Sequence, residues 1–460
     1  MERHYSVYFD ILDRLQDLYN QAIAPFTRIH QIQGKAHRSP LEGQTVSRVP
    51  GVVTAVRDNG FYLQDPIGDG DDATSEGVFV FTDAAPTVQV GDVALIRGTV
   101  REFRPGEPDG GNLTITQIVD PTVRVLFNSD FFLPRPTLIG SEGRQPPTEI
   151  IDNDAVEGNA ENPETVFDPD EDGLDFYESL EGMLVQVDDA VAIAPSNRFG
   201  EVYVLPNNGE NATIRTPRGG LVRRENDFNP ERIQIDTSLT DAAPAVNAGD
   251  RFDSITGVLD YSFGNFEVLT TSPLSVTPGG LSPETTSLTP GDNQLTVASY
   301  NVLALSPDDE EQIEAIAQQI VNNLRSPDIL GLQEIEDNNG EVDDGTVDAS
   351  ETYTALIDAI AAAGGPRYEF RDVPPVDSED GFPGTNFRPG FLFNPERVSF
   401  IDRPGDTLSE GTQVIDGVLS ASPGRIDPNN PAFEESIRPI IGEFEFNGDR
   451  LFIINHQLPI

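Results

Sequence analysis

The stretch "LTVASYNVLALSPDDEEQIEAIAQQIVNNLRSPDILGLQEIE" (residues 295–336) decides the fold class of the C-terminal third of the chain. It opens with an apolar run, continues with apolar residues at helical spacing, and closes with a second apolar run. This strand–helix–strand order predicts an α/β unit in which helices cover a sheet. A second helical pattern at 350–365 and apolar runs at 387–398, 440–448 and 450–457 extend the same layered unit.

The sequence upstream has a different texture, with short alternating segments separated by Asn-Gly, Gly-Asp-Gly and Pro-Gly turns. Five such segments in residues 29–128 predict a small β-barrel, which we expect to be of OB type. Residues 140–276 repeat the order, since "VGDVALIRGTVREF" (90–103) aligns with "AGDRFDSITGVLDYS" (248–262). The chain is therefore predicted to be multidomain, with two all-β OB-like barrels followed by a partial α/β domain over 295–460.

Two further segments lie outside these domains. Residues 1–28 carry apolar residues at helical spacing up to Pro25, which predicts an N-terminal amphipathic helix, and residues 277–294 have the Ser-, Thr-, Pro- and Gly-rich composition of a linker. The start lacks the features of a signal peptide, so the chain as it stands is not expected to be exported. No run reaches transmembrane length, so we expect no membrane partner.

The composition is strongly acidic, with 29 Lys plus Arg against 78 Asp plus Glu and a formal net charge of −49. Such a surface repels a phosphate backbone at long range, so a nucleic-acid substrate would have to be met through metal ions or a local arginine cluster. Adaptation to high salt, a halophilic character, explains the same composition, because screening makes an acidic surface tolerable. The absence of cysteine excludes disulfides, thiolate metal sites and a cysteine nucleophile.

Three polar residues interrupt apolar runs of the last domain at the ends of predicted strands: Asn301, Glu334 and His456. Side chains at such positions are held by a rigid sheet and open into the crevice where α/β sheets bind ligands. A carboxylate there suits Mg²⁺, an amide can orient a bound water or phosphate, and an imidazole can move a proton. Taken alone, each residue is more often a turn former, a solvated acid or a structural histidine; their order and setting together favour a functional role.

The motifs around these residues, "SYNVLAL", "ILGLQEIEDNNG" and "FIINH", resemble strand motifs of the endonuclease/exonuclease/phosphatase superfamily, the deoxyribonuclease-I-like metal-dependent phosphodiesterases. Segments such as "RIHQIQG", "GFYLQDP" and "DFYESLEGMLV" resemble the front half of bacterial extracellular nucleases, which place OB-type domains before that catalytic domain. The resemblance covers nearly all of residues 28–456. It implies a four-layer α/β/β/α sandwich, an extracellular location for the family, and hydrolysis of DNA, with RNA as an alternative.

Carried over by position, the resemblance makes Asn301 the amide near the metal and the scissile phosphate, Glu334 the metal carboxylate and His456 a catalytic histidine. The implied cofactor is Mg²⁺ or Mn²⁺. Arg438 and Arg388 become candidates for phosphate contacts, because the guanidinium fork matches phosphate oxygens. Either arginine can instead pair with one of the many carboxylates of the chain.

The resemblance departs at "NHQLPI" (455–460), where the family continues into an Asp-x-Asn motif and a terminal Asp-His. The chain is therefore expected to hold the N-terminal half of the catalytic domain and to be truncated, with strands 440–446 and 451–456 facing water. We expect it to be a weakly active or inactive nuclease. Two alternatives stay open: a phosphatase acting on a smaller phosphoester, and a non-catalytic OB-type protein that binds single-stranded nucleic acid.

Two acidic motifs remain. "DPDEDGLDFYES" (168–179) places Asp168, Asp170 and Asp172 at EF-hand-like positions, but Ser179 stands where a bidentate Glu is needed, so we interpret it as a solvated turn. "DPIGDGDDATSEG" (65–77) is interpreted as a plain acidic turn, with Ca²⁺ binding as the alternative; its aspartates are Asp65, Asp69, Asp71 and Asp72.

Aromatic residues of the first barrel allow two roles. Phe61, Tyr62, Phe79 and Phe81 are placed where OB-folds stack bases. Alternation puts Phe79 and Phe81 on one face, so core packing is the expected role for that pair.

Overall fold

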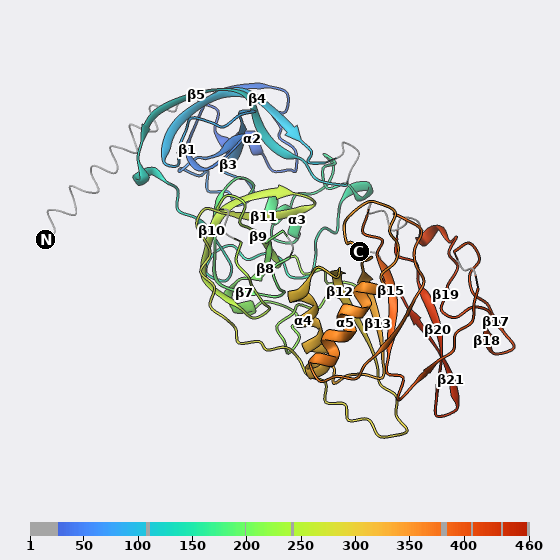
Figure 1. The fold of residues 1–460 in the computed structure, drawn as a ribbon. Coiled ribbons are helices and arrows are strands. Elements are labelled where there is room, and N and C mark those ends of the chain that lie inside the picture. The colour runs from blue at the N-terminus through green and yellow to red at the C-terminus, as the bar shows by residue number, and fades with distance from the viewer. Residues whose placement is uncertain are drawn as a thin grey trace. The chain divides into compact units, whose positions relative to one another are not determined.

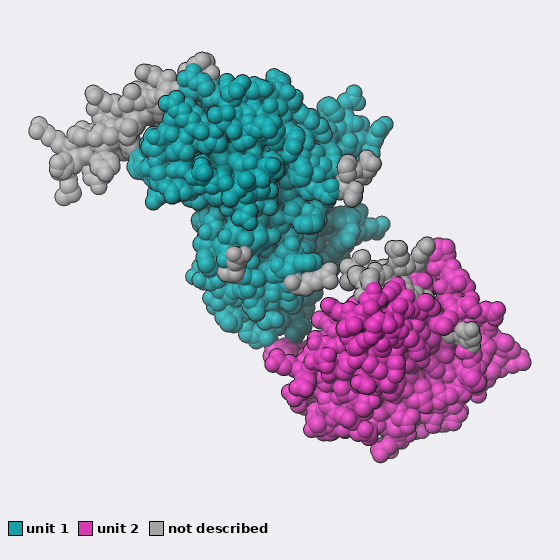
Figure 2. Space-filling view, turned by 45° about the horizontal axis from the view of Figure 1, so that its top comes forward, with its two compact units in different colours: residues 1–281 teal, residues 282–460 magenta. Residues whose placement is uncertain are grey.

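The computed structural model describes residues 26–106, 111–197, 199–240, 243–378, 384–405, 408–433 and 436–457. The chain divides into two compact units, Met1–Leu281 and Ser282–Ile460, coloured separately in Figure 2. The structure is mostly β and multidomain, as predicted. The N-terminal helix expected up to residue 25 lies outside the described residues. Within the described ranges, every helix is too short or too polar to cross a membrane.

The first barrel is closed by five strands (Figure 1): β1 (Thr45–Arg57), β2 (Gly60–Gln64), β3 (Gly77–Phe81), β4 (Asp92–Phe103) and β5 (Ile115–Asn128). They follow the order β1-β2-β3-β5-β4 and return to β1; β3 and β5 are parallel, and the other pairs are antiparallel. Their inward side chains form one core, which the short helix α2 (Ile29–Gln33) completes with two buried isoleucines. The barrel predicted from the alternating segments is confirmed.

The second sheet of this unit repeats that order with β7 (Leu184–Ala192), β8 (Val202–Leu205), β9 (Ile233–Asp236), β11 (Asn265–Thr270) and β10 (Arg251–Ser262). Pairing of β10 with β7 makes a ring, β9 and β11 are its parallel pair, and β6 (Thr137–Ile139) adds to β7. The helix α3 (Gly173–Glu178) packs Phe176 and Tyr177 into its core. The weak sequence repeat therefore corresponds to a repeated strand order.

The two rings of the first unit pack directly on one another. Tyr62 and Phe79 of the first contact a patch of the second that contains Leu184, Val258 and Leu269. A Cβ placed on Gly77 would lie 2.1 Å from the carbonyl carbon of Gly182, so only glycine permits this approach of two backbones. Phe79 packs in the core as expected. The base-stacking role considered for Phe61 and Tyr62 is wrong for this conformation, because both rings are fully buried.

The second unit contains the predicted α/β layer. Its sheet has the order β12 (Val297–Leu305), β13 (Ile329–Ile335), β15 (Arg388–Phe393), β14 (Glu369–Asp372), with β12 and β13 parallel. One face is covered by α4 (Glu310–Gln318), which continues as the π-helical turn η4 (Gln319–Asn323), and by α5 (Ser350–Ala362) (Figure 1). The strand–helix–strand pattern of residues 295–336 is thus confirmed.

A second sheet covers the other face. It is formed by β16 (Ser399–Phe400), β20 (Ile440–Phe446), β19 (Gly424–Arg425) and β21 (Asp449–Asn455). Ile440 and Phe444 of β20 pack against Ile329, Phe391 and Phe393 of the first sheet. The expectation that strand 440–446 faces water is therefore wrong, because its apolar side chains point into this core. On β21 the expectation holds for one face only: Phe452 and Ile454 are 38% and 60% exposed, whereas Leu451 and Ile453 pack against this core.

Short elements complete the fold. They are the hairpin β17 (Val414–Ile415) and β18 (Val418–Leu419), and the 3-10 turns η1 (Asp130–Phe132), η2 (Val156–Gly158), η3 (Asn207–Gly209) and η5 (Pro431–Phe433).

Candidate functional site

The strands β12 and β13 become irregular at the positions of Asn301 and Glu334. The pairing of β12 with β13 shifts register between positions 301 and 305, and that of β13 with β15 shifts between positions 332 and 335. Glu334 has φ 60°, in the left-handed region that costs a non-glycine residue about 1–3 kcal/mol. Such irregularities re-aim side chains and recur beside active sites. The backbone here directs side chains out of the sheet at an energetic cost.

Three separate β-segments converge on the Glu334 carboxylate. Asn301 Nδ2 donates a hydrogen bond of 2.8 Å to Glu334 Oε1, and Gln457 Nε2, just beyond β21, donates one of 2.6 Å to the same oxygen. The amide of Asn301 is itself fixed, because its Oδ1 accepts from the backbone N–H of Leu303 at 2.8 Å. The structure thus brings Asn301 and Glu334 together and adds Gln457.

The free oxygens of this cluster fit a hard divalent cation. Both amides donate to Oε1 of Glu334, and no described residue donates to its Oε2. The Oε1 atom of Gln457 is buried and has no hydrogen-bond partner among the described residues. Carboxylate and amide oxygens are ligands that Mg²⁺ and Mn²⁺ accept, and Mg²⁺ commonly uses one or two carboxylates plus substrate phosphates.

The cluster has one carboxylate rather than several. In the described part of the chain, Glu334 belongs to no group of three or more acidic or histidine side chains whose ligand atoms lie close enough to share an ion. A cation here would therefore be held by few protein ligands.

His456 is adjacent in sequence to Gln457 of this cluster, but its ring contacts a different residue. Its ring packs edge-on against Phe433, with centroids 5.5 Å apart, and its Nδ1 is buried without a hydrogen-bond partner. The preceding Asn455 is buried and donates at 2.8 Å to the carbonyls of both Leu332 and Gly390, which ties β21 to the first sheet. The catalytic role of His456 stays a prediction.

Asn455 and Gln457 are the residues that the sequence reading missed. The available signal was the uninterrupted polar run Asn-His-Gln at the end of an apolar strand, since three consecutive polar residues there present side chains to both faces.

The two candidate arginines line one small hollow, together with Arg425. Arg388 is 1% exposed; its Nη1 and Nη2 donate to the carbonyls of Val347 (2.5 Å) and Asn386 (3.0 Å), and its Nη1 lies 3.6 Å from Asp372. Burial raises the pKa of the Asp372 carboxyl, although Arg388 opposes the shift.

Arg438 lies beside the contact that holds His456. Its Nη1 donates to the carbonyls of Ser436 (2.6 Å) and of Phe433, the residue whose ring meets His456. Phosphate contacts by Arg388 and Arg438 stay predictions.

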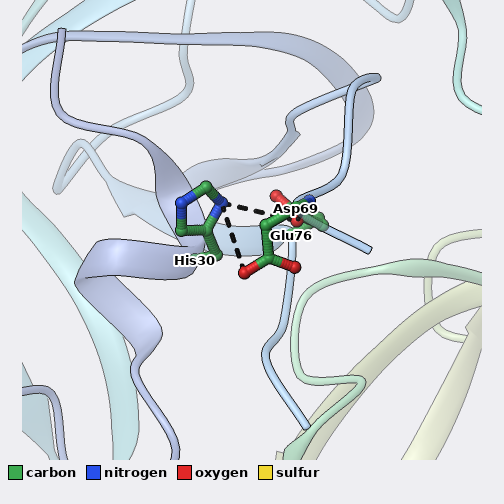
Figure 3. Close-up of side chains that lie close together, drawn as sticks. All are labelled: His30, Asp69 and Glu76. Carbon is green, nitrogen blue, oxygen red and sulfur yellow. Dashed lines mark hydrogen bonds and ion pairs between the residues drawn. The ribbon is translucent and has the colours of Figure 1, made fainter. Parts of the chain in front are cut away.

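The acidic loop 65–77 of the first barrel distributes its aspartates among different partners. Asp65 accepts from Arg28 at 2.5 Å, and Asp71 pairs with Lys35. Asp69 instead joins Glu76 and His30, a residue of α2 (Figure 3). His30 Nδ1 lies 3.5 Å from Glu76 Oε1 and 3.9 Å from Asp69 Oδ2. Burial, the largest cause, raises the pKa of Glu76 to about 7.

A hollow of about 670 Å³ lies in the second ring, away from every predicted site residue. Its lining includes Arg251 and several carboxylates: Glu142, Asp188, Asp189, Glu210 and Asp253. This predominance of acids would repel a phosphate-bearing ligand.

Comparison with known proteins adds a family model for one part of the chain. Residues 138–278, which contain the second ring, match the model of a domain of unknown function, DUF8508. The search of curated proteins gives no match.

Two solved structures are similar to part of the chain. One is a humanized D. rerio TDP2 carrying 14 mutations (16% identity, TM-score 0.19, 35% of this chain and 45% of that one). Another is a functionally unknown conserved protein from Enterococcus faecalis V583 (17% identity, TM-score 0.20, 35% and 51%). The chain spans about half the length of these structures, and TM-scores of this size do not establish a shared fold.

Proposed function

We propose that this chain belongs to the lineage of bacterial extracellular nucleases and that its second unit carries the metal half of a phosphodiesterase site acting on DNA, with RNA as the alternative. The observation that carries the proposal is the convergence of Asn301, Glu334 and Gln457 where the pairing of β12, β13 and β15 is irregular. A single strained carboxylate, oriented by two amides and left with one open oxygen, is an arrangement suited to a cation rather than to structural packing.

Each side chain has a definite task in this proposal. Glu334 Oε2 and Gln457 Oε1 would hold Mg²⁺ or Mn²⁺, while the amide N–H groups of Asn301 and Gln457 fix the orientation of the carboxylate through Oε1. A bound divalent cation would polarise the phosphate and neutralise its charge, which matters in a chain of net charge −49. His456 would donate a proton to the leaving oxygen, its ring steadied by Phe433.

The architecture is consistent with this lineage. Both rings of the first unit follow the order first-second-third-fifth-fourth with a parallel third–fifth pair, which we infer to be the OB arrangement. In the second unit, helices, a mixed sheet and a second sheet lie in successive layers, which supports a partial α/β/β/α sandwich.

The alternative of a non-catalytic single-strand binder is less well supported. The aromatic side chains that would stack bases on β2 and β3, Tyr62 and Phe79, are covered by the second ring. The phosphatase alternative concerns the same cluster and differs only in substrate.

The test is hydrolysis and Mn²⁺ binding by the full chain. Single-stranded DNA, RNA and a phosphate monoester are supplied with Mg²⁺ or Mn²⁺, and bound Mn²⁺ is counted by electron paramagnetic resonance. We expect weak turnover of the polymers, because Glu334 is a lone carboxylate ligand. Glu334→Gln should weaken one Mn²⁺ site by at least about tenfold.

The matched control is Glu341→Gln, which changes an exposed acid of the following loop and should alter neither readout. Unchanged Mn²⁺ binding in Glu334→Gln would contradict the proposed site. If only the phosphate monoester is hydrolysed, the proposed nuclease activity is wrong and the phosphatase alternative takes its place.

A further inference from the structure

Five aspartates of the first unit lie in one cluster that the proposed function does not use. They form two groups of three, and within each group one carboxylate oxygen per residue lies within 4.8 Å of those of the other two residues. The first group is Asp152, Asp154 and Asp172, and the second is Asp168, Asp172 and Asp175. Asp172 belongs to both, so the cluster is continuous. It lies within the residues that match the domain of unknown function.

Asp172 is the centre of the cluster and is buried. Asp172 is 1% exposed. Its Oδ2 accepts one long hydrogen bond of 3.3 Å from the backbone N–H of Asn153, and its Oδ1 has no hydrogen-bond partner among the described residues. One oxygen each of Asp154 and Asp168 is likewise buried without a partner. The interpretation of 168–179 as a solvated turn is therefore wrong, because residues about twenty positions upstream fold over it.

The nearby basic side chains carry too little positive charge to neutralise the five aspartates of this cluster. His37 donates from Nε2 to Asp175 at 2.7 Å, but its other nitrogen lies 3.2 Å from Glu178, so it serves an acid outside the cluster as well. Buried carboxylates are normally paired with bases or bound to metal ions.

The number and the type of the ligands favour a large, hard cation. Ca²⁺ takes about 6–8 oxygen ligands in flexible geometry, whereas Mg²⁺ needs a near-ideal octahedron and usually keeps several waters, so a crowded set of carboxylates suits Ca²⁺ better. From these two overlapping groups of carboxylates, which share the buried Asp172 with its unpartnered Oδ1, we propose that Asp152, Asp154, Asp168, Asp172 and Asp175 form a Ca²⁺ site.

This site differs from the EF-hand-like pattern in its own sequence. That pattern would use Asp168, Asp170 and Asp172, but Asp170 is exposed and belongs to neither group. The ion would instead join the loop before η2 to the first turn of α3. Between β6 and α3 the chain has only the three-residue turn η2 as regular structure, so the ion would fix a long irregular segment against the second ring.

The test uses the full chain, stripped of metal with EDTA and dialysed, and titrated with CaCl₂ by calorimetry and by thermal unfolding. We expect Ca²⁺ to bind and to raise the melting temperature, since a ligand that binds only the folded state stabilises it. Asp172→Asn and, at the less buried edge, Asp154→Asn should each weaken Ca²⁺ binding by at least about tenfold. Asp170→Asn, from the same turn, should bind as the unchanged chain does.

Several outcomes decide against the site. They are absence of Ca²⁺ binding at millimolar concentration, unchanged affinity in both Asp172→Asn and Asp154→Asn, loss of affinity in Asp170→Asn, or displacement of Ca²⁺ by an equal concentration of Mg²⁺. Circular dichroism of each variant without metal shows whether it has folded, and Asp154→Asn carries the test if Asp172→Asn has not. Glu334→Gln should leave this binding intact, which keeps the site separate from the proposed nuclease function.

Discussion

The two units bury their carboxylates in different ways. In the second unit, Glu443 is 0% exposed and is paired with Arg403 at 2.9 Å and Arg450 at 2.7 Å. In the first unit, Glu231 and Glu267 are each 2% exposed, and no described Lys, Arg or His forms an ion pair with either. The second unit thus neutralises the buried Glu443 with two of its own bases, while the first leaves Glu231 and Glu267 to protons or cations.

The pKa values follow this division. In the first unit, burial is the largest cause of a raised pKa at these carboxyls: Glu76, Glu102, Asp154, Asp168, Asp172, Glu181, Glu231, Asp260 and Glu267. In the second unit, burial is the largest cause of a raised pKa at Asp372, where Arg388 opposes the shift. The difference teaches that a buried carboxylate of one acidic chain can be stabilised in two ways, by a paired base or by a bound proton or cation.

The largest expected loss of stability comes from removing the bases that pair with a buried acid of the second unit, so that it resembles the unpaired buried acids of the first. The double variant Arg403→Met, Arg450→Met leaves Glu443 buried without a base, and we expect a loss of about 3–5 kcal/mol in the free energy of unfolding. Urea unfolding measures it. Arg367→Met removes an exposed pair with Asp358 and serves as the control, with little change. A loss below about 1 kcal/mol in the double variant would contradict the view that the second unit depends on bases to stabilise its buried Glu443.

A smaller effect is expected from neutralising Glu231. Burial raises its pKa to about 7, above the ordinary 4.5, so the folded state must either hold a proton or bury a charge. The cost of Glu231 to the free energy of folding is largest above pH 7, falls as the pH drops from 7 to 4.5, and is absent below pH 4.5. Glu231→Gln should therefore stabilise the chain by up to about 3 kcal/mol at pH 8, from about 1.4 kcal/mol per pKa unit. The gain should vanish near pH 4.5.

Urea unfolding of Glu231→Gln and the unchanged chain at both pH values gives the measurement. A gain that is equal at pH 8 and pH 4.5 would show that ionisation of Glu231 is not its cause.

The smallest effect sharpens the comparison by separating pairing from burial. Asp402 is exposed and accepts from Arg371 at 2.8 Å and 2.9 Å. Because water screens this pair, Asp402→Asn should cost less than about 1 kcal/mol in the same unfolding experiment. A cost similar to that of the Glu443 pairs would mean that pairing itself, rather than burial, sets the difference between the units.

Much of the fold was predictable because local patterns determine it. Alternation and turn residues gave the five strands of the first barrel, and helical spacing at Ile313, Ile316 and Ile320 gave α4. Contacts between elements were not predictable in the same way. The burial of Tyr62 depends on the second ring, and that of β20 on the strands of the opposite sheet, neither of which leaves a mark in the local sequence.

The candidate site shows the same limit. Asn301 and Glu334 come together because they lie on neighbouring parallel strands where the regular pairing stops; the strand–helix–strand pattern already indicated that these strands are neighbours. The contact of Gln457 depends on how the chain leaves β21, and the Asp172 cluster depends on a loop folding back over a turn. Both are set by tertiary structure beyond any residue spacing.

The close approach of Gly77 to Gly182 has a consequence for how the first unit comes apart. With two backbones in contact and aromatic rings sealed between them, neither ring of strands can loosen without exposing the other's apolar surface to water. The two rings should consequently unfold in a single calorimetric transition. A fragment that contains one ring alone should be unstable and prone to aggregate.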